Sequence, residues 1–310
     1  MMKRKNYRQP NSVTVVETVP SQSTENDTTR CGCWGLVGWH VFAAVLHGGS
    51  FLALLILYFV FGENALQGFL VRDTFDFDEK QIVLEKPYKY DLALVLLPMP
   101  ALTSLFHIIQ AVLSRDSLID EYSKDSDWIE KLQDRYLSAV KRGVNAVRWL
   151  EYSITAGLMT WIIAQLSGIT NLYLVILLAA VGNVTLQCHG YMHERLFMDN
   201  ELAYKNWNNW IPFINGSVIF LGQWAILAAY FITNVDASGV SNVPWYVWVS
   251  FLGLFFTFGL FPWVQICYAR RWLGVKNWFK YEWWFIFLSI VSKLLLDWTL
   301  FAGIITRDME

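Results

Sequence analysis

The sequence predicts an all-α integral membrane protein, folded as one bundle of seven transmembrane helices. Of its 310 residues, 55% are apolar and only 16% are charged, whereas about 25% are charged in an ordinary soluble domain. Seven apolar runs reach the roughly 20 residues that a helix needs to cross the hydrocarbon core of a bilayer. The net charge of −2 gives no sign of nucleic-acid binding, and four cysteines exclude a disulfide-rich scaffold.

The apolar runs divide the chain into three parts. Residues 1–33 are polar and are expected to form a disordered cytoplasmic tail, and residues 306–310 a short extracellular tail. The transmembrane domain between them covers residues 34–305. Its predicted spans are residues 34–61, 92–113, 145–166, 172–193, 209–232, 245–268 and 283–305.

Lysine and arginine predict how the bundle is oriented in the bilayer. The tail and the connections after the second, fourth and sixth spans hold 17 of these residues, and the opposite side holds 5. Cytoplasmic loops of membrane proteins carry the excess of positive charge. The sequence therefore predicts a cytoplasmic N-terminus and an extracellular C-terminus.

Two connections are long enough to hold structure of their own. The first, residues 62–91, contains Phe75-Asp-Phe-Asp and Gln81-Ile-Val-Leu, whose alternation indicates short strands. A solvated acidic loop is the alternative for this segment. The second, residues 114–143, contains a run beginning at Trp128 that is typical of an amphipathic helix.

Four charged side chains fall inside the predicted spans: Arg148, Glu151, Lys293 and Asp297. A charge at the centre of a bilayer costs about 2.5–3.5 kcal/mol on insertion scales, so each one calls for a reason. Lys293 lies near the middle of the seventh span. A buried lysine tends to lose its proton, and a neutral amine forms Schiff bases with aldehydes. The alternative is an ion pair with Asp297, one helical turn further on.

Glu151 follows Arg148 by three residues, so both side chains face the same way on the third span. A buried carboxylate stays charged when a cation lies nearby, and a protonated Schiff base on Lys293 would be such a cation. The alternative is a local ion pair between Arg148 and Glu151 that only holds the bundle together.

Two motifs resemble those of the heliorhodopsins. They are Arg148-Trp-Leu-Glu151-Tyr-Ser in the third span and Ser289-Ile-Val-Ser-Lys293 in the seventh. The resemblance covers about residues 34–305, and the lysine and arginine count agrees with the inverted topology of that family. It implies a rhodopsin-like bundle with a partly β-structured outer first loop, which 62–91 can supply.

The resemblance also implies a role for individual residues. Lys293 would carry retinal, all-trans in the dark, as a protonated Schiff base, with Glu151 as its counterion. Ser289 stands where ion pumps keep a second carboxylate. The other implied sites are the Schiff-base neighbours Arg148 and Asp297, the inner proton network His47, His107 and Glu194, and the retinal pocket Tyr152, Thr155, Phe258, Phe261, Pro262 and Gln265.

The family resemblance favours a light-sensing photoreceptor in a lipid bilayer, not an enzyme. In such a protein light converts all-trans retinal to 13-cis, a proton moves internally, and the change is signalled to an unknown partner. A homodimer formed through the first outer loop is a further family expectation. Asp297 has no place in the family pattern and would extend a polar path outward from Lys293.

Two other functions remain open. The first is light-driven or light-gated proton transport through Glu151, Asp297, Glu194 and the histidines. An outward pump of the common design would need a proton donor eleven residues after Glu151, where this chain has Ile162. The second is a seven-span metal-dependent hydrolase, because His189 and His193 stand at i, i+4 beside Glu194. That function would also use His47 and His107, and would leave Lys293 unexplained.

Overall fold

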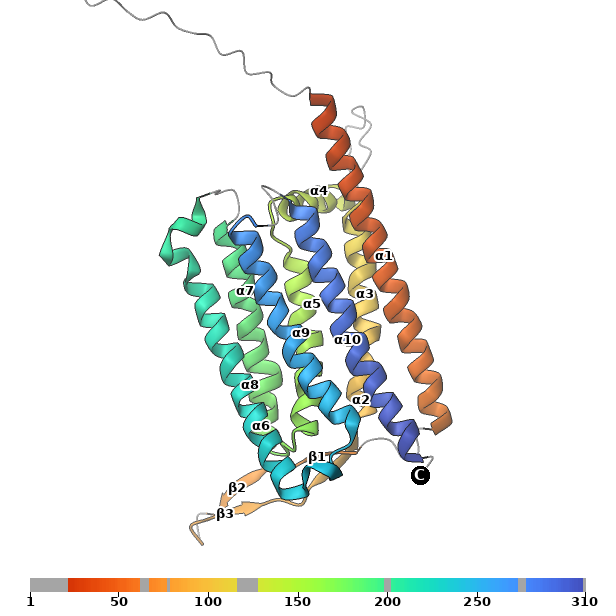
Figure 1. Ribbon diagram of the computed structural model, residues 1–310, viewed down its shortest axis with the longest axis vertical. Coiled ribbons are helices and arrows are strands. Elements are labelled where there is room, and N and C mark those ends of the chain that lie inside the picture. The colour runs from red at the N-terminus through yellow and green to blue at the C-terminus, as the bar shows by residue number, and fades with distance from the viewer. Residues whose placement is uncertain are drawn as a thin grey trace, which may run out of the picture.

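The computed structural model describes residues 22–61, 67–76, 79–115, 128–197, 202–272 and 277–308. Seven long helical units run side by side through the described chain (Figure 1). They are α1 (Gln22–Phe61), α2 and α3 (Ala93–Leu96 and Pro98–Leu113), α5 (Ala146–Leu166), α6, the π-helical turn η2 and α7 (Leu172–Ile176, Leu177–Gly182 and Asn183–Phe197), α8 (Ile211–Ser238), α9 (Trp245–Ala269) and α10 (Trp278–Asp308).

Six of these units are long and apolar enough to cross a membrane. The remaining one, α5, has 21 residues, but Arg148 and Glu151 lower its hydropathy. It lies inside the bundle, in contact with α3, α7 and α9. Its charged residues Arg148 and Glu151 are buried, so they face protein and not lipid. The predicted seven-helix bundle is thus confirmed.

Several helix ends differ from the predicted spans. The first helix begins at Gln22, so residues 22–33, assigned to the disordered tail, are helical, while residues 1–21 lie outside the described residues. The fourth unit continues to Phe197 and α10 begins at Trp278. Side-chain caps mark two starts, because Asn145 accepts a hydrogen bond from the Arg148 amide and Asn171 accepts one from the Leu174 amide.

Four short strands confirm that the first connection has β-structure. The antiparallel pairs are β1 with β4 (Gln67–Leu70 with Tyr88–Asp91) and β2 with β3 (Asp73–Asp76 with Gln81–Leu84). The second pair projects away from the bundle at the end that we call the hairpin end (Figure 1). The first pair is tied to α5, because the Phe69 amide donates to Gln165 Oε1 at 2.8 Å and Trp161 Nε1 donates to the Tyr90 hydroxyl at 2.7 Å.

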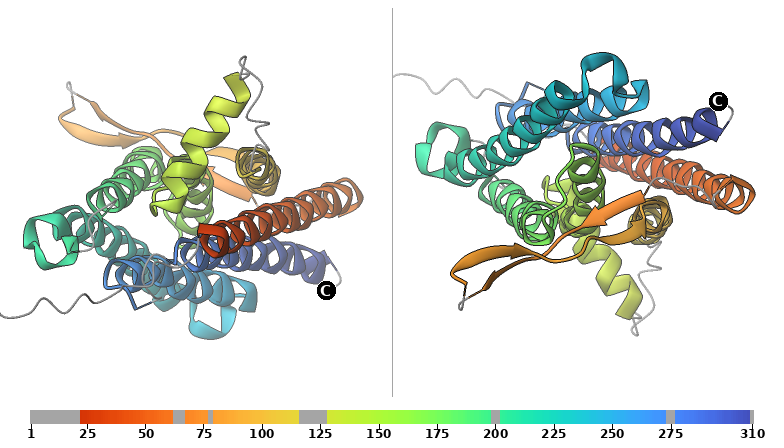
Figure 2. Two further views of the ribbon diagram at one scale, coloured as in Figure 1. Left: turned by 90° about the horizontal axis from the view of Figure 1, so that it is seen from above. Right: turned by 90° about the horizontal axis from the view of Figure 1, so that it is seen from below.

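The second long connection holds the predicted amphipathic helix, α4 (Trp128–Lys141). It crosses the opposite end of the bundle, which we call the α4 end (Figures 1 and 2). Its inner face buries Tyr136, Leu137 and Val140, whereas Trp128 is exposed. The Gln133 side chain donates to the Val112 carbonyl at 2.8 Å and fastens α4 to the end of α3.

The bundle has its polar groups inside and many large apolar side chains outside. Exposed residues such as Val45, Ile56 and Phe59 cover the outer face of α1. Lipid is as apolar as these side chains, so their exposure costs little in a bilayer. Buried polar side chains then have to satisfy one another within the protein, and they concentrate between α1, α3, α5, α7 and α10.

One close helix contact depends on glycine. A Cβ atom on Gly157 of α5 would lie 2.7 Å from the Ala179 carbonyl oxygen in η2, which is backbone and cannot turn aside. Beside it, Asn183 Nδ2 donates to the carbonyls of Tyr152 and Ser153 at 3.2 and 2.9 Å. The π-helical turn and the glycine therefore bring α5 and α7 together at the level of the buried charges.

We expect Gly157→Ala to destabilise the protein by about 1–3 kcal/mol, because the added methyl group forces two backbones apart. The matched control is Gly222→Ala in α8, where a Cβ atom would meet nothing within 4 Å. Thermal unfolding in detergent checks both variants. A Gly157→Ala protein as stable as the Gly222→Ala protein would contradict the tight contact.

Candidate functional site

The centre of the bundle holds an ion pair between α10 and α5. Lys293 Nζ donates to Glu151 Oε1 at 2.6 Å, and the two residues are 2% and 1% exposed. The alternative ion pair between Lys293 and Asp297 is not formed. Instead, neither oxygen of Asp297 has a hydrogen-bond partner among the described residues. The cation and the counterion that the two motifs predict therefore lie in direct contact.

Arg148 does not pair with Glu151 either. Its guanidinium binds Glu194 of α7 and Glu282 of α10, and all three side chains are buried. We call these three residues the Arg148 cluster. The view that only four charged residues lie within the spans is therefore wrong. Glu194 lies one residue after the predicted end of the fourth span, and Glu282 lies one residue before the predicted start of the seventh.

Neighbouring side chains complete the Arg148 cluster. Glu194 accepts hydrogen bonds from Trp149 Nε1 at 2.7 Å and from the Tyr281 hydroxyl at 2.6 Å. The guanidinium carbon of Arg148 lies 3.9 Å from the centre of the Phe285 ring. Hydrogen bonds and a cation–π contact offset the loss of hydration that these charges suffer on burial.

A chain of hydrogen bonds joins the central pair to the α4 end. Glu151 Oε2 accepts from Gln110 Nε2 at 3.2 Å, and Gln110 Oε1 accepts from Asn145 Nδ2 at 3.0 Å. Asn145 Nδ2 also lies 2.9 Å from Glu282 Oε2 in the Arg148 cluster. The Tyr136 hydroxyl of α4 donates to Gln110 Oε1 at 3.3 Å. Four helices, α3, α4, α5 and α10, thus share one polar network.

Tyr136 enters that network as a neutral phenol. Burial, reinforced by the negative charge of Glu282, raises the pKa of Tyr136 above its usual range. Its hydroxyl therefore keeps its proton and remains a hydrogen-bond donor. Neither Tyr136 nor Gln110 was predicted as a site residue. Their spacing from Glu151 in the sequence holds no signal, because they meet it only through the packing of α3 and α4.

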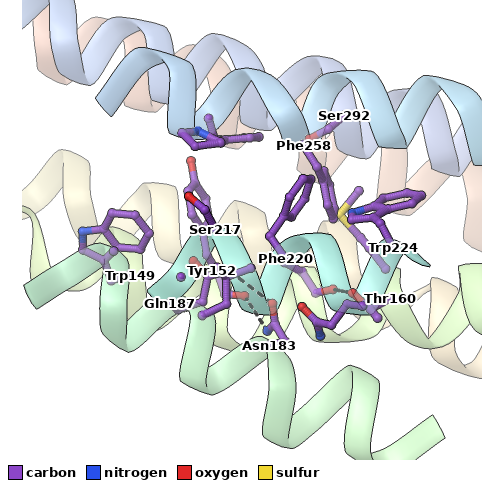
Figure 3. A pocket seen from close by; sticks show the side chains of 18 of the residues that line it. Trp149, Tyr152, Thr160, Asn183, Gln187, Ser217, Phe220, Trp224, Phe258 and Ser292 are labelled. Atoms are coloured by element: carbon purple, nitrogen blue, oxygen red, sulfur yellow. Dashed lines mark hydrogen bonds between the residues drawn. The ribbon is translucent and has the colours of Figure 1, made fainter. Parts of the chain in front are cut away.

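An apolar cavity lies on the other side of the ion pair, between α5, α7, α8, α9 and α10. Lys293 and Ser289 line it, as do all six residues predicted for the pocket: Tyr152, Thr155, Phe258, Phe261, Pro262 and Gln265. Figure 3 shows Trp149, Phe220 and Trp224 completing the wall. The sequence did not single out these three aromatic residues, because aromatic side chains occur throughout the predicted spans.

The histidines form a separate group between α1 and α3. The ring of His107 stacks on that of His47, with centres 5.9 Å apart, and its Nδ1 lies 3.0 Å from Nδ1 of His40. His40 is buried and was not predicted. In the part of the chain that the structure describes, no hydrogen bond joins these rings to Glu194, which belongs to the Arg148 cluster. The predicted inner network is therefore divided between two places.

The residues of the hydrolase hypothesis do not come together. His189 Nδ1 lies 2.8 Å from the Thr185 carbonyl oxygen, whereas the His193 ring packs against Phe197 and Trp210. Within the described ranges, no group of three or more His, Cys, Asp or Glu side chains could hold a metal ion. A metal centre built from these histidines has no support in the geometry.

Comparison with known proteins agrees with the fold. The transmembrane domain of Salpingoeca rosetta rhodopsin phosphodiesterase superposes with a TM-score of 0.52 at 10% identity, over 93% of this chain and 100% of that one. At this identity the likeness concerns the fold alone. No curated protein matches the chain. A sequence model of the heliorhodopsin family matches residues 36–305 and so runs through all seven helical units. The chain therefore belongs to the heliorhodopsin family.

Proposed function

We propose that this heliorhodopsin is a light-sensing photoreceptor. In this proposal Lys293 holds retinal, all-trans in the dark, as a protonated Schiff base, and Glu151 is the counterion. The observation that carries the proposal is the 2.6 Å contact between Lys293 Nζ and Glu151 Oε1 at the wall of an aromatic cavity. When bound, retinal supplies the absorption of visible light and the isomerisation from all-trans to 13-cis.

The residues around Lys293 fit such a chromophore. A polyene needs a long apolar cavity, and Phe220, Trp224 and Phe258 provide aromatic walls. The amine that would anchor it lines the same cavity, and its charged form is matched by one carboxylate. Ser289 supplies a neutral hydroxyl group. A second carboxylate at this position would leave the site with an excess of negative charge.

The polar network gives the light reaction a route to the α4 end. Lys293 Nζ is placed to pass a proton to Glu151 Oε1. Once Glu151 is neutral, the hydrogen bond that it accepts from Gln110 Nε2 is no longer strengthened by charge. The side-chain oxygen of Gln110 accepts hydrogen bonds from Asn145 and Tyr136, so these residues are affected as well. We infer that this rearrangement is the signal and that α4 presents it to a partner. The protein then acts through a change of shape and not as an enzyme.

Orientation and assembly are part of the same proposal. The excess of lysine and arginine at the α4 end supports a cytoplasmic N-terminus, and hence an extracellular hairpin end and C-terminus. The exposed apolar side chains of β3, Ile82 and Leu84, support a homodimer formed through the outer hairpins.

We expect the full-length protein to form a visible absorption band when all-trans retinal is added, and Lys293→Ala to abolish it. Only a buried amine inside the cavity can both reach the chromophore and retain its counterion. The matched control is Lys280→Ala, which removes an exposed lysine from the same helix and should leave the band intact. Absence of the band in the wild-type protein would refute the retinal-binding function.

We expect Glu151→Gln to move that band to longer wavelength. The carboxylate stabilises the positive charge at the Lys293 nitrogen in the dark state, and its loss narrows the gap to the excited state. Glu194→Gln is the control, because Glu194 is separated from Lys293 by Gln110 and Asn145, and its shift should be much smaller. Equal shifts in the absorption spectra of the two variants would show that Glu151 is not the counterion.

Proton transport is the second candidate function, and the buried Asp297 on the hairpin side of Lys293 is the observation in its favour. We nevertheless expect no steady photocurrent at either sign of voltage. Among the described residues, hydrogen bonds connect Lys293 to the α4 end and not to the hairpin end. Voltage-clamped cells that express the protein provide the measurement, with Lys293→Ala as the blank. A steady light-dependent proton current at either sign of voltage would favour transport.

A further inference from the structure

Asp297 is a buried carboxyl group for which the photoreceptor proposal has no use. It is 0% exposed and lies one helical turn beyond Lys293, towards the hairpin end of α10. Neither of its oxygens has a hydrogen-bond partner among the described residues. The nearby cation is already bound, since Lys293 donates to Glu151. An ionised carboxylate without a donor is very costly in such a place, so Asp297 holds its proton.

Two of the helices that pack against α10 carry buried polar side chains in the same part of the bundle. On α1 these are His47 and Ser50, and on α3 they are Thr103 and His107, all of them buried. Side-chain atoms of His47, Ser50 and Thr103 have no partner within the described ranges. Within the described residues, α1 and α3 therefore carry unpartnered buried polar atoms, as Asp297 does. In the part of the chain that the structure describes, the buried cations are Lys293, bound to Glu151, and Arg148, bound to Glu194 and Glu282, so none is left to pair with Asp297.

Lys293 thus stands between two carboxyl groups in different states. Glu151 is ionised and in direct contact, and Asp297 is protonated and placed at i+4 on the same face of α10. Two carboxyl groups near one nitrogen can exchange the roles of acid and base when a proton is moved between them.

We propose that Asp297 takes over from Glu151 as the counterion of Lys293 after light absorption, through a closed exchange of one proton. This inference rests on the proposed function as a retinal photoreceptor. It assigns to Asp297 the role of an internal proton donor, and it explains how a carboxyl group outside the family pattern serves the light reaction.

The exchange has two steps that balance. In the first, the N–H bond at Lys293 Nζ breaks and an O–H bond forms at Glu151 Oε1, so both groups become neutral. In the second, the O–H bond of Asp297 breaks and an N–H bond forms again at Nζ, so the positive charge returns beside an Asp297 carboxylate. The net change is one proton moved from Asp297 to Glu151. Recovery reverses both steps, and no proton crosses the membrane.

The exchange gives the signal a lifetime. After the first step alone, the proton on Glu151 would return to Nζ at once. After the second step Nζ is occupied, and Glu151 remains neutral until Asp297 takes its proton back. During that time Gln110 binds a neutral acid in place of a carboxylate, and the network that includes Tyr136 relaxes.

Light-minus-dark infrared spectroscopy of the full-length, retinal-loaded protein in lipid tests the proposal. We expect the C=O stretching band of one protonated carboxyl group to disappear, and this band should shift in protein labelled with ¹³C-aspartate. A new C=O band of a protonated carboxyl group should appear, and it should shift in protein labelled with ¹³C-glutamate. Among the aspartates whose side-chain exposure the structure describes, only Asp297 is buried. Asp297→Asn should remove the aspartate signal completely, while Asp236→Asn, at an exposed site of α8, should preserve it.

The visible spectrum supplies a second test. Because Asp297 is neutral in the dark, Asp297→Asn should leave the absorption maximum nearly unchanged while shortening the life of the light-induced state, and Asp297→Glu should restore that lifetime. If Asp297→Asn shifts the absorption maximum as far as Glu151→Gln does, Asp297 is ionised in the dark and the exchange is overturned. An infrared light-minus-dark spectrum in which no aspartate C=O band is lost would also overturn it. Both results require a protein that has bound retinal, so they are distinct from failure of the photoreceptor proposal, in which no visible band forms.

Discussion

The structure depends on the requirement that every charge inside the bilayer be matched within the protein. Lys293 is matched by Glu151, and Arg148 is matched by Glu194 and Glu282. Removing one partner of a buried pair typically costs about 3–5 kcal/mol, because the other charge is left uncompensated. These two centres therefore fix how α5, α7 and α10 stand relative to one another, since each ion pair joins residues more than 40 positions apart.

The helix α5 is the part of the bundle that makes this matching possible. Its first turns supply both Arg148 and Glu151, and these charges are tolerated because both side chains are buried against other helices. The glycine contact with η2 and the Asn183 hydrogen bonds bring it close to the fourth unit. Trp149, Tyr152 and Thr155 of the same helix line the aromatic cavity. The first turns of one helix thus supply both the buried charges and part of the cavity wall.

Much of this arrangement was predictable from the sequence. The seven helical units, the strands near Phe75 and Gln81 and the helix at Trp128 follow from periodicity and apolar length, which are local properties. The resemblance carried by the two motifs led to Lys293 and Glu151, which the structure brings into contact. Partner choice was harder to predict. Spacing along a helix favours Lys293 with Asp297 and Arg148 with Glu151, yet both cations bind carboxylates on other helices, because pairing in a bundle is decided by packing.

The residues that were missed share one cause. Glu282 was placed outside the seventh span, and Gln110, Asn145, Tyr136 and His40 carry no pattern that separates them from ordinary polar positions. These residues matter because their side chains are buried, and their burial is determined only when the helices pack. A polar residue at the end of a span can face water or the protein interior, and in this chain Gln110, Glu194 and Glu282, near the ends of α3, α7 and α10, are buried.

The attachment of the first β pair to α5 has a thermodynamic consequence. This helix is one continuous element from Ala146 to Leu166, with Glu151 near one end and Trp161 and Gln165, which hold Tyr90 and Phe69, near the other. A rigid rod transmits displacement in both directions. If illumination changes the position of α5, then the β pairs at the hairpin end change their affinity for whatever binds them. By reciprocity, a molecule bound there shifts the equilibrium between the two positions of α5 by the same free energy. The two faces of the membrane are thereby linked through a single helix.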